Sequence, residues 1–399
     1  MTTAATQTKA PAAGGASPLR FEALREAANA LTPAIVAGRA QWRDEADLTS
    51  GIVAEMKDAG LLRAFQPRRW GGLELDPQQL FEIQNVFAGH CLSTAWVYGV
   101  LSVQSFMLGR MDPQAQADVW QADPTVLVSS SFAPAANVVP VDGGYRISGR
   151  FTFSSGSSHA DWAMVGGIVP PDGDRPAPQM RLFLVPAADY RIDRCWDPFG
   201  LRATGSNDLV IEDAFVPAYR TMAPDSGIQP LPAASGLPPL YRLPWLYVFA
   251  STISNLAIGG GRAALDRFVA ITRERQGAMG SGPSRDDPKF LSAIGRMRVE
   301  LDTVQQQFDR NYGVLIDCVA RDAQLASAEA LLYRAELTGF LRRIVSLVDE
   351  LMLLLGGRGI DRSGPLTAIW LDLMAARAHA GNDPSAVHVQ LAQALIDRN

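Results

Sequence analysis

The sequence contains few cysteines and few histidines. Its 399 residues include three cysteines and four histidines. Cys91, Cys195 and Cys318 lie far apart, form no C-x-x-C pair and have no neighbouring histidine that would complete a metal-binding set. The composition therefore predicts no metal site, and it favours a reducing, cytoplasmic setting.

Concentrated positive charge and long apolar runs are missing as well. The net charge is −5, and the 36 Lys and Arg residues are spread along the chain, which argues against a nucleic-acid partner. No apolar run approaches the roughly 20 residues that a helix needs to span a bilayer. Residues 1–17 lack an apolar core of signal-peptide length, and their Ala, Thr and Gly content predicts a disordered tail.

Two nucleotide-binding motifs are missing or incomplete. The chain has no G-x-x-x-x-G-K-[ST] loop, so nucleotide hydrolysis is not indicated. Gly259-Gly260-Gly261 begins a G-x-G-x-x-A spacing, but a dinucleotide-binding motif needs a strand before the glycines and another after the helix. Here the flanking residues read as one continuous helix, and no strand follows. We interpret the match as accidental.

Hydrophobic periodicity divides the chain into three parts. Residues 18–124 show the three-to-four-residue spacing of helices, and residues 125–228 change to the alternation of strands. Fourteen of the 26 prolines fall between Pro134 and Pro239, which suits short strands with abrupt turns. Residues 229–239 form a linker rich in Pro, Gly and Ser. Residues 240–399 are again helical, with no proline between Pro288 and Pro365.

One stretch of the predicted β-domain could contact a flat ligand. GRFTFSSGSSHADWAMVGG, residues 149–167, reads as two strands that present small hydroxyls at their junction. With GLRATGSNDLVIEDAFVP at 200–217, it resembles the middle β-domain of the acyl-CoA dehydrogenase superfamily. The sequence Ser-Thr-Ala-Trp at 93–96 resembles that of the flavin-dependent monooxygenase branch, and the resemblance covers nearly everything after residue 18.

The resemblance implies an α+β fold and an activity. The fold would comprise an N-terminal helical domain, a middle β-barrel or sandwich and a C-terminal four-helix bundle. The chain would be the oxygenase component of a two-component system that hydroxylates a phenolic or polycyclic aromatic substrate through a flavin C4a-hydroperoxide. A separate flavin reductase would supply reduced FMN or FAD, since this chain shows no means of reducing flavin with NAD(P)H. The superfamily is usually homotetrameric.

His379 is the predicted catalytic residue. The segment GGRGIDRSGPLTAIWLDLMAARAHAGNDPSA, which contains it, resembles the C-terminal signature of the monooxygenases. Acyl-CoA dehydrogenases place a Tyr-Glu pair here, which falls on His379 and Ala380. Alanine cannot take a proton, whereas an imidazole has a pKa near neutrality and can act as acid or base toward a phenol. Ser154 is the second predicted catalytic residue, facing the reactive side of the flavin, with Ser155 beside it.

The resemblance also implies a set of cofactor-binding residues. Arg275 matches an arginine that binds the flavin phosphate, commonly from a neighbouring subunit, and a guanidinium suits that contact. Leu371 stands where the family usually has an arginine. The complete predicted set is Trp96, Ser130, Ser131, Phe132, Phe153, Ser154, Ser155, Arg275, Gly356, Gly357, His379 and Ala380.

Two other activities fit the same scaffold. An acyl-CoA dehydrogenase would need a carboxylate base, and Glu274 lies in a neighbourhood where some members place theirs. An N- or S-oxygenase would use the same flavin chemistry on a different substrate atom. The residues alone do not separate these alternatives from aromatic hydroxylation.

Overall fold

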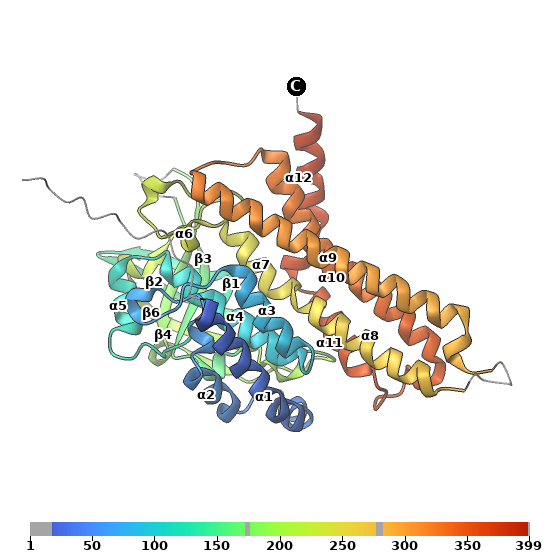
Figure 1. The fold of residues 1–399 in the computed structure, drawn as a ribbon. Helices are drawn as coiled ribbons and strands as arrows, with labels where there is room; N and C mark the ends of the chain where they lie inside the picture. The colour runs from blue at the N-terminus through green and yellow to red at the C-terminus, as the bar shows by residue number, and fades with distance from the viewer. Residues whose placement is uncertain (1–17, 172–175, 277–281, 398–399) are drawn as a thin grey trace, which may run out of the picture.

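The computed structural model describes residues 18–171, 176–276 and 282–397. The predicted disordered tail, residues 1–17, lies outside the described residues. Helices form the two ends of the chain and strands its middle (Figure 1). None of the described helices is long and apolar enough to cross a membrane.

The N-terminal part is helical and surrounds one fully buried helix. Its α-helices are α1 (Pro18–Glu45), α2 (Ser50–Asp58), α3 (Pro77–Ala88), α4 (Leu92–Gly109) and α5 (Pro113–Trp120). Every residue of α4 is buried, which its sequence allows because it carries no charged side chain. The helix therefore runs through the molecule, with the other N-terminal helices, the sheet and the C-terminal helices packed around it.

The middle of the chain forms one seven-stranded sheet in the order β5-β6-β2-β1-β3-β4-β7. The strands are β1 (Val128–Val141), β2 (Gly144–Ser154), β3 (Trp162–Val169), β4 (Gln179–Pro186), β5 (Arg191–Asp193), β6 (Asn207–Pro217) and β7 (Thr221–Met222). β1 and β2 form a hairpin, with Gly143 in its turn at a φ of 74°. Glycine adopts this left-handed conformation at little cost.

Strand β1 joins two halves of the sheet. Its first half pairs with β3 in parallel and its second half pairs with β2 in antiparallel fashion. The pairing with β3 is irregular at Pro134, which has no N–H to donate. Next to this irregularity, a Cβ on Gly166 would lie 2.3 Å from the Phe132 carbonyl oxygen, so the close approach of β1 and β3 requires glycine there. The two halves enclose a separate apolar core that includes Phe151, Val165 and Phe183.

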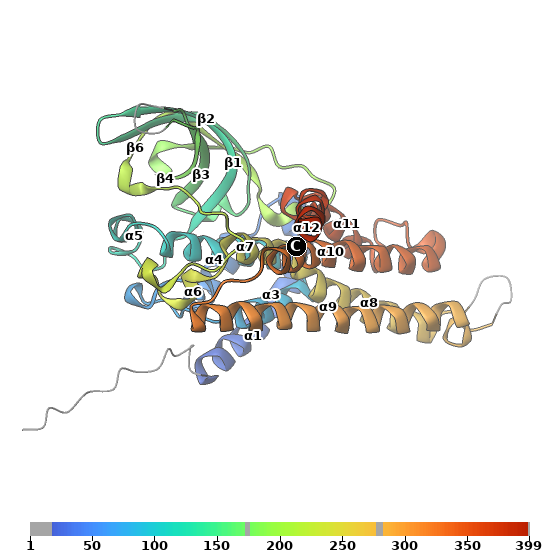
Figure 2. The same ribbon diagram turned by 90° about the horizontal axis from the view of Figure 1, so that it is seen from above.

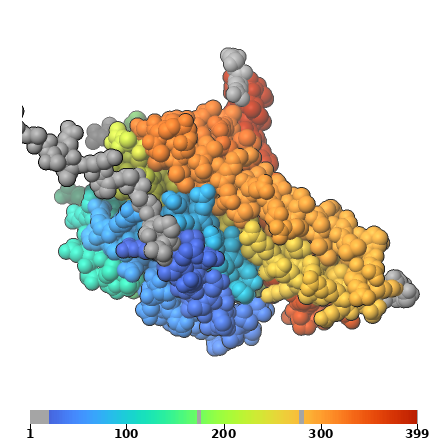
Figure 3. Space-filling model, in the orientation of Figure 1, coloured from blue at the N-terminus to red at the C-terminus, as the bar shows by residue number. Residues whose placement is uncertain are grey.

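The C-terminal part is a helical bundle that extends to one side of the molecule (Figures 2 and 3). Its helices are α6 (Pro239–Arg242), α7 (Trp245–Ser254), α8 (Leu256–Glu274), α9 (Pro288–Arg321), α10 (Ser327–Leu355), α11 (Thr367–Arg377) and α12 (Ser385–Ile396). α10 contacts α7, α8, α9, α11 and α12. The predicted α+β fold with a C-terminal helical bundle is therefore confirmed.

The three consecutive glycines at 259–261 lie inside α8 and serve packing. A Cβ on Gly259 would lie 2.7 Å from Ala88, and one on Gly260 would lie 2.9 Å from Leu92. The glycines therefore let α8 approach α3 and the start of α4. The interpretation of the G-x-G-x-x-A spacing as accidental is confirmed, because the glycines are preceded by helix α7 and not by a strand.

Candidate active site

Buried and half-buried aromatic side chains from all three parts of the chain meet around His379. The centroid of the His379 ring lies 5.7 Å from that of Trp96 in α4 and 6.4 Å from that of Phe249 in α7. Phe249 in turn lies 5.1 Å from Phe132 of β1. We call Trp96, Phe132, Phe249 and His379 the aromatic cluster. Its flat, apolar side chains suit a planar aromatic ligand.

A chain of hydroxyl groups leads from the aromatic cluster into the β-domain. The indole N–H of Trp96 donates to Ser155 Oγ at 3.0 Å. Ser155 Oγ lies 2.7 Å from Ser206 Oγ, which lies 2.6 Å from Thr204 Oγ1. Thr204 donates its hydroxyl proton to the Leu201 carbonyl.

The direction of each donation along this chain is fixed, because a hydroxyl has one proton. Thr204 has given its proton to Leu201, so Ser206 must donate to Thr204 and Ser155 must donate to Ser206. Ser155 Oγ therefore keeps one lone pair that meets no donor among the described residues. It can accept a hydrogen bond from a ligand N–H, but it has no proton to offer.

The structure does not bring Ser154 into this site. Ser154 ends β2 opposite Asn207, is fully buried, and its hydroxyl has no hydrogen-bond partner among the described residues. Ser155 follows the end of the strand, after Phe153 with its left-handed φ of 63°, and it is the Ser155 hydroxyl that Trp96 contacts. The hydroxyl that reaches the aromatic cluster therefore belongs to Ser155, beside the predicted Ser154.

The other predicted residues of the β-domain lie around the aromatic cluster in different ways. Phe132 belongs to it, and Ser130 is half-buried on the same strand. Ser131 is buried and donates to the Thr152 carbonyl at 2.8 Å, so its proton is already used within the protein. Phe153 is 67% exposed, has a φ of 63° and packs its ring edge-on against Trp196. Phe153 therefore forms the solvent-facing rim beside Ser155.

The protonation state of His379 follows from its backbone contact. The N–H of Gly381 donates to His379 Nδ1 at 2.9 Å, so Nδ1 carries no proton. A neutral imidazole must then carry its proton on Nε2. Burial lowers the pKa of His379 to about 4, and the positive charge of Arg334 lowers it further in the same direction. At neutral pH His379 is therefore an uncharged hydrogen-bond donor.

The turn that carries His379 is held by its own backbone and by two helices. His379 precedes the short 3-10 helix η11 (Ala380–Asn382). The Asn382 amide donates to the carbonyls of Ile253 and Ala376, and Ser254 donates to its oxygen. A fully buried asparagine with all these partners fixes the turn against α7 and α11.

Substituting Gly381→Ala is expected to destabilise the protein by about 1–3 kcal/mol through overpacking. A Cβ on Gly381 would lie 2.6 Å from Ile253 Cδ1 and 3.2 Å from His379 Nδ1. Urea unfolding measures the loss. The additional substitution Ile253→Val removes the clashing Cδ1 and should recover most of it. A double variant no more stable than Gly381→Ala alone would contradict this account of the turn.

Three predicted cofactor residues lie away from the aromatic cluster. Arg275 follows the last turn of α8, where it donates to the Leu354 carbonyl at 2.9 Å and lies over the Phe290 ring. Gly356 and Gly357 begin η10 (Gly356–Arg358), directly after α10. These residues form the far end of the bundle. Ala380, by contrast, is exposed directly beside His379.

No carboxylate takes the position that an acyl-CoA dehydrogenase needs. Glu274 is exposed at the far end of α8. Among the described residues, the one charged group that shifts the pKa of His379 is Arg334, which is a cation. Within the described part of the chain, no carboxylate is among the groups that shift the pKa of His379, which argues against the dehydrogenase alternative.

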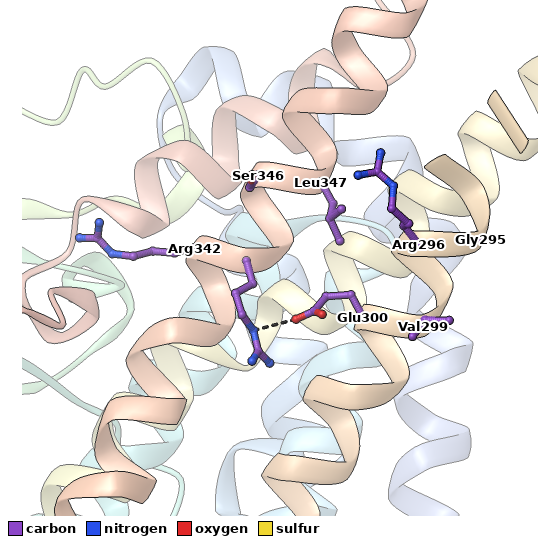
Figure 4. A pocket seen from close by; sticks show the side chains of 8 residues that line it. Gly295, Arg296, Val299, Glu300, Arg342, Ser346 and Leu347 are labelled. Carbon is purple, nitrogen blue, oxygen red and sulfur yellow. Dashed lines mark ion pairs between the residues drawn. The ribbon is translucent and has the colours of Figure 1, made fainter. Parts of the chain in front are cut away.

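Two of the hollows on the described surface involve the C-terminal helices. The hollow in Figure 4, of about 740 Å³, lies between α9 and α10, includes an ion pair between Arg343 and Glu300, and contains no predicted site residue. A second hollow, of about 1240 Å³, lies between the loop before β6 and the helices α10 and α11. It is lined by Arg43, Asp44, Pro198, Phe199, Arg202, Asp349, Met352, Leu353, Gly356, Gly359, Ile360, Arg362, Thr367, Trp370 and Leu371.

This donor set fits the flavin that the resemblance implies. The aromatic cluster offers planar apolar faces, and Ser155 offers an unused acceptor to a ring N–H. The larger hollow has three arginines, Arg43, Arg202 and Arg362, in its wall, and guanidinium groups suit phosphates. Sequence reasoning missed Phe249 and Ser206. Phe249 lies in an apolar helix whose facing the sequence does not reveal.

Comparisons with known proteins agree with this reading. Residues 251–384 match the family model described as acyl-CoA dehydrogenase, C-terminal domain. The oxygenase subunit HsaA of a flavin-dependent monooxygenase from Rhodococcus jostii is 32% identical over 90% of this chain and 95% of its own. The oxygenase component of an FADH2-dependent resorcinol hydroxylase from Rhizobium is 30% identical over 86% of this chain and 87% of its own.

Solved structures give the same result for the fold. XiaF from Streptomyces, determined in complex with FADH2 and glycerol, has a TM-score of 0.87 and 26% identity, over 96% of both chains. The likeness to these proteins spans the helical ends and the β-domain together. The chain therefore belongs to the flavin-dependent monooxygenases of acyl-CoA dehydrogenase-like fold, as an oxygenase subunit, and it is an oxidoreductase.

Proposed function

We propose that this chain is the oxygenase component of a two-component system and hydroxylates a phenolic or polycyclic aromatic substrate. A partner flavin reductase supplies the reduced FMN or FAD. The observation that carries the proposal is the pairing, within one aromatic cluster, of an Nε2–H donor on His379 with an unused acceptor on Ser155. A reduced flavin, when bound, supplies the electrons that activate O2 for insertion into the substrate.

In this proposal, His379 acts on the oxygen of the substrate. Its Nε2–H donates to the phenolic oxygen and favours the phenolate, because a donor stabilises the charged form of its partner. A phenolate is more electron-rich at its ortho carbon than a phenol. His379 thus favours binding of the phenolate that has already released its proton to solvent, while the Gly381 N–H keeps Nδ1 from taking a proton.

Ser155 and the surrounding rings act on the flavin. The unused lone pair of Ser155 accepts from a flavin ring N–H, and the proton of Ser155 stays with Ser206. Trp96, Phe132 and Phe249 exclude water from the reacting atoms, which protects an activated oxygen species from side reactions. These residues come from α4, β1 and α7, so all three parts of the chain enclose the ligand.

A second subunit completes the site in our proposal. Arg275, Gly356 and Gly357 lie at the far end of the bundle, and Leu353 and Ile360 nearby are 81% and 84% exposed. Exposed apolar side chains of this kind suit an interface. We infer a homo-oligomer, of which a homotetramer is the form expected, in which this end approaches the flavin of a neighbour. Arg275→Gln should weaken flavin binding without altering the aromatic cluster.

Anaerobic titration with reduced FMN and FADH2, followed by oxygen and a panel of phenols, tests the proposed function. We expect tight binding of one reduced flavin and a hydroxylated product for at least one phenol. Reduction of bound oxidised flavin by an acyl-CoA would contradict the proposal and restore the dehydrogenase alternative. If the protein bound reduced flavin but oxidised only nitrogen or sulfur substrates, it would still be a flavin-dependent oxygenase, but the proposal of aromatic hydroxylation would be wrong.

The pKa of His379 also predicts how stability depends on pH. Burial lowers this pKa from 6.5 to about 4, so the unfolded chain binds more protons than the folded chain between these values. The contribution of His379 to the free energy of unfolding therefore falls as the pH drops from 6.5 toward 4. In urea unfolding at pH 7 and pH 5, His379→Asn should lose less stability than the wild type. An equal loss in both proteins would contradict the lowered pKa.

A further inference from the structure

Arg334 is a buried cation that has no carboxylate partner. It lies on α10 with 9% of its surface exposed. Within the described residues it forms no ion pair, although the other six arginines of α9 and α10 do. A buried charge without a counter-ion is costly, so its presence calls for a function.

The guanidinium of Arg334 makes one hydrogen bond, to the turn that carries His379. Its Nη2 donates to the Gly381 carbonyl at 2.9 Å. Its Nη1 is buried and meets no acceptor among the described residues. Arg334 and Tyr247, whose buried hydroxyl also has no partner, both line a cavity of about 10 Å³. That is about the space of one water molecule, so the cavity cannot hold a carboxylate.

The contacts of Gly381 connect Arg334 with the imidazole. Gly381 accepts from Arg334 through its carbonyl and donates to His379 Nδ1 through its N–H. It has no room to move toward α7, since a single added carbon would lie 2.6 Å from Ile253. Gly381 is thus held from one side by Arg334 and from the other by Ile253, and its N–H points at Nδ1.

We propose that Arg334 is a positioning residue of the hydroxylation reaction, which holds Gly381 so that His379 stays in the Nε2–H tautomer facing the substrate. The inference rests on the proposed function. Without Arg334, the Gly381 carbonyl loses its donor and the turn can rotate. Nδ1 can then take the proton, and the nitrogen that faces the substrate becomes an acceptor instead of a donor.

The test uses three substitutions at this position and one control. Arg334→Met removes the donor and the charge. In Arg334→Gln the new side chain is uncharged and can be buried, but it is about two bonds too short to reach Gly381. In Arg334→Lys the new side chain keeps a charged donor at nearly the same length. Arg298→Met, at an exposed arginine of α9 with 70% of its side chain accessible, is the control for loss of one positive charge.

The tautomer is measured directly by isotope-edited infrared spectroscopy of protein containing ring-labelled histidine. His379→Asn identifies the His379 band among those of the four histidines. We expect the wild type, Arg334→Lys and Arg298→Met to show the Nε2–H form. Arg334→Met and Arg334→Gln should show a mixture of both forms. If Arg334→Met does not fold, the comparison of the Gln and Lys variants decides the question.

The second measurement is the product formed per reduced flavin oxidised. Arg334→Met and Arg334→Gln should lose about tenfold or more of this yield, a typical effect for a misoriented catalytic group, and release hydrogen peroxide instead. An unchanged tautomer in both variants would overturn the inference, whatever the yield. If the wild type hydroxylates no phenol, the proposed function fails, while the tautomer measurement still judges the role of Arg334.

Discussion

Replacing His379 by alanine is expected to lower the rate of aromatic hydroxylation by about 10²- to 10³-fold, the range typical of losing a hydrogen-bond donor to a negatively charged oxygen in an active site. The affinity for reduced flavin should change little, because the Ser155 acceptor and the rings of Trp96 and Phe249 remain. Oxygen would still be consumed, and hydrogen peroxide would replace the hydroxylated product. Rapid quenching with product analysis measures the loss, and flavin titration measures the binding.

The variant His379→Gln separates two roles for the imidazole. The glutamine amide can donate a hydrogen bond from nearly the position of Nε2, but it cannot act as a base. If His379 serves as a donor, as its contact with Gly381 indicates, His379→Gln should retain a measurable part of the activity that His379→Ala loses. Equal losses in the two variants would instead favour proton abstraction by the imidazole.

The substitution Ser155→Ala is expected to divert most of the oxygen consumed into hydrogen peroxide. In our proposal Ser155 would offer an acceptor to a flavin N–H, and alanine offers none. Removing a preorganised hydrogen-bond partner of a reacting group typically costs about 10²-fold or more. Stopped-flow absorbance after mixing the reduced enzyme with oxygen measures the lifetime of the activated state, which should shorten accordingly.

The neighbouring variant Ser154→Ala is the matched control for this experiment. It removes the same hydroxyl from the adjacent residue, whose oxygen is buried and has no partner. An unsatisfied buried hydroxyl costs about 1–3 kcal/mol, so this variant should be at least as stable as the wild type. It should also form as much hydroxylated product per flavin oxidised as the wild type does. A loss of product per flavin oxidised in Ser154→Ala but not in Ser155→Ala would reverse the assignment of the two serines.

The sequence was sufficient to predict the order of helical and β elements. Helical spacing, the clustering of prolines and the Asp142-Gly143-Gly144 turn each report a local preference of the backbone, and local preferences survive in the fold. The prediction of helix at 259–261 succeeded because a dinucleotide-binding motif needs a strand on each side of its glycines, and the residues that flank these glycines have a helical pattern. His379 was selected through the resemblance of its segment to known monooxygenases.

The details of the site depend on the direction in which each side chain points, and this direction is not set by the neighbouring residues in the sequence. Ser154 and Ser155 are identical side chains one residue apart, and only the pairing of β2 with β6 decides which one points inward. Phe249 and Arg334 lie on helices with many apolar neighbours, so their spacing alone could not single them out. His379 is a donor through Nε2 because the Gly381 backbone N–H occupies Nδ1, and a backbone contact of this kind cannot be recognised from a sequence motif.

The contacts around His379 also have a consequence for how the protein is made. Trp96 and Ser155, which contact each other, are 59 residues apart in the chain. His379 comes later in the chain than both of them, and the residues that hold its turn, Arg334 and Gly381, are 47 residues apart. During translation, domains fold in order from the N-terminus as the ribosome releases them. The β-domain can therefore form while the turn at 379–382 is still unsynthesised, and a nascent or prematurely terminated chain lacks His379, to which we assign the hydrogen bond to the substrate. Messages cut short upstream of this turn should yield polypeptides that are unable to hydroxylate, even where they capture flavin.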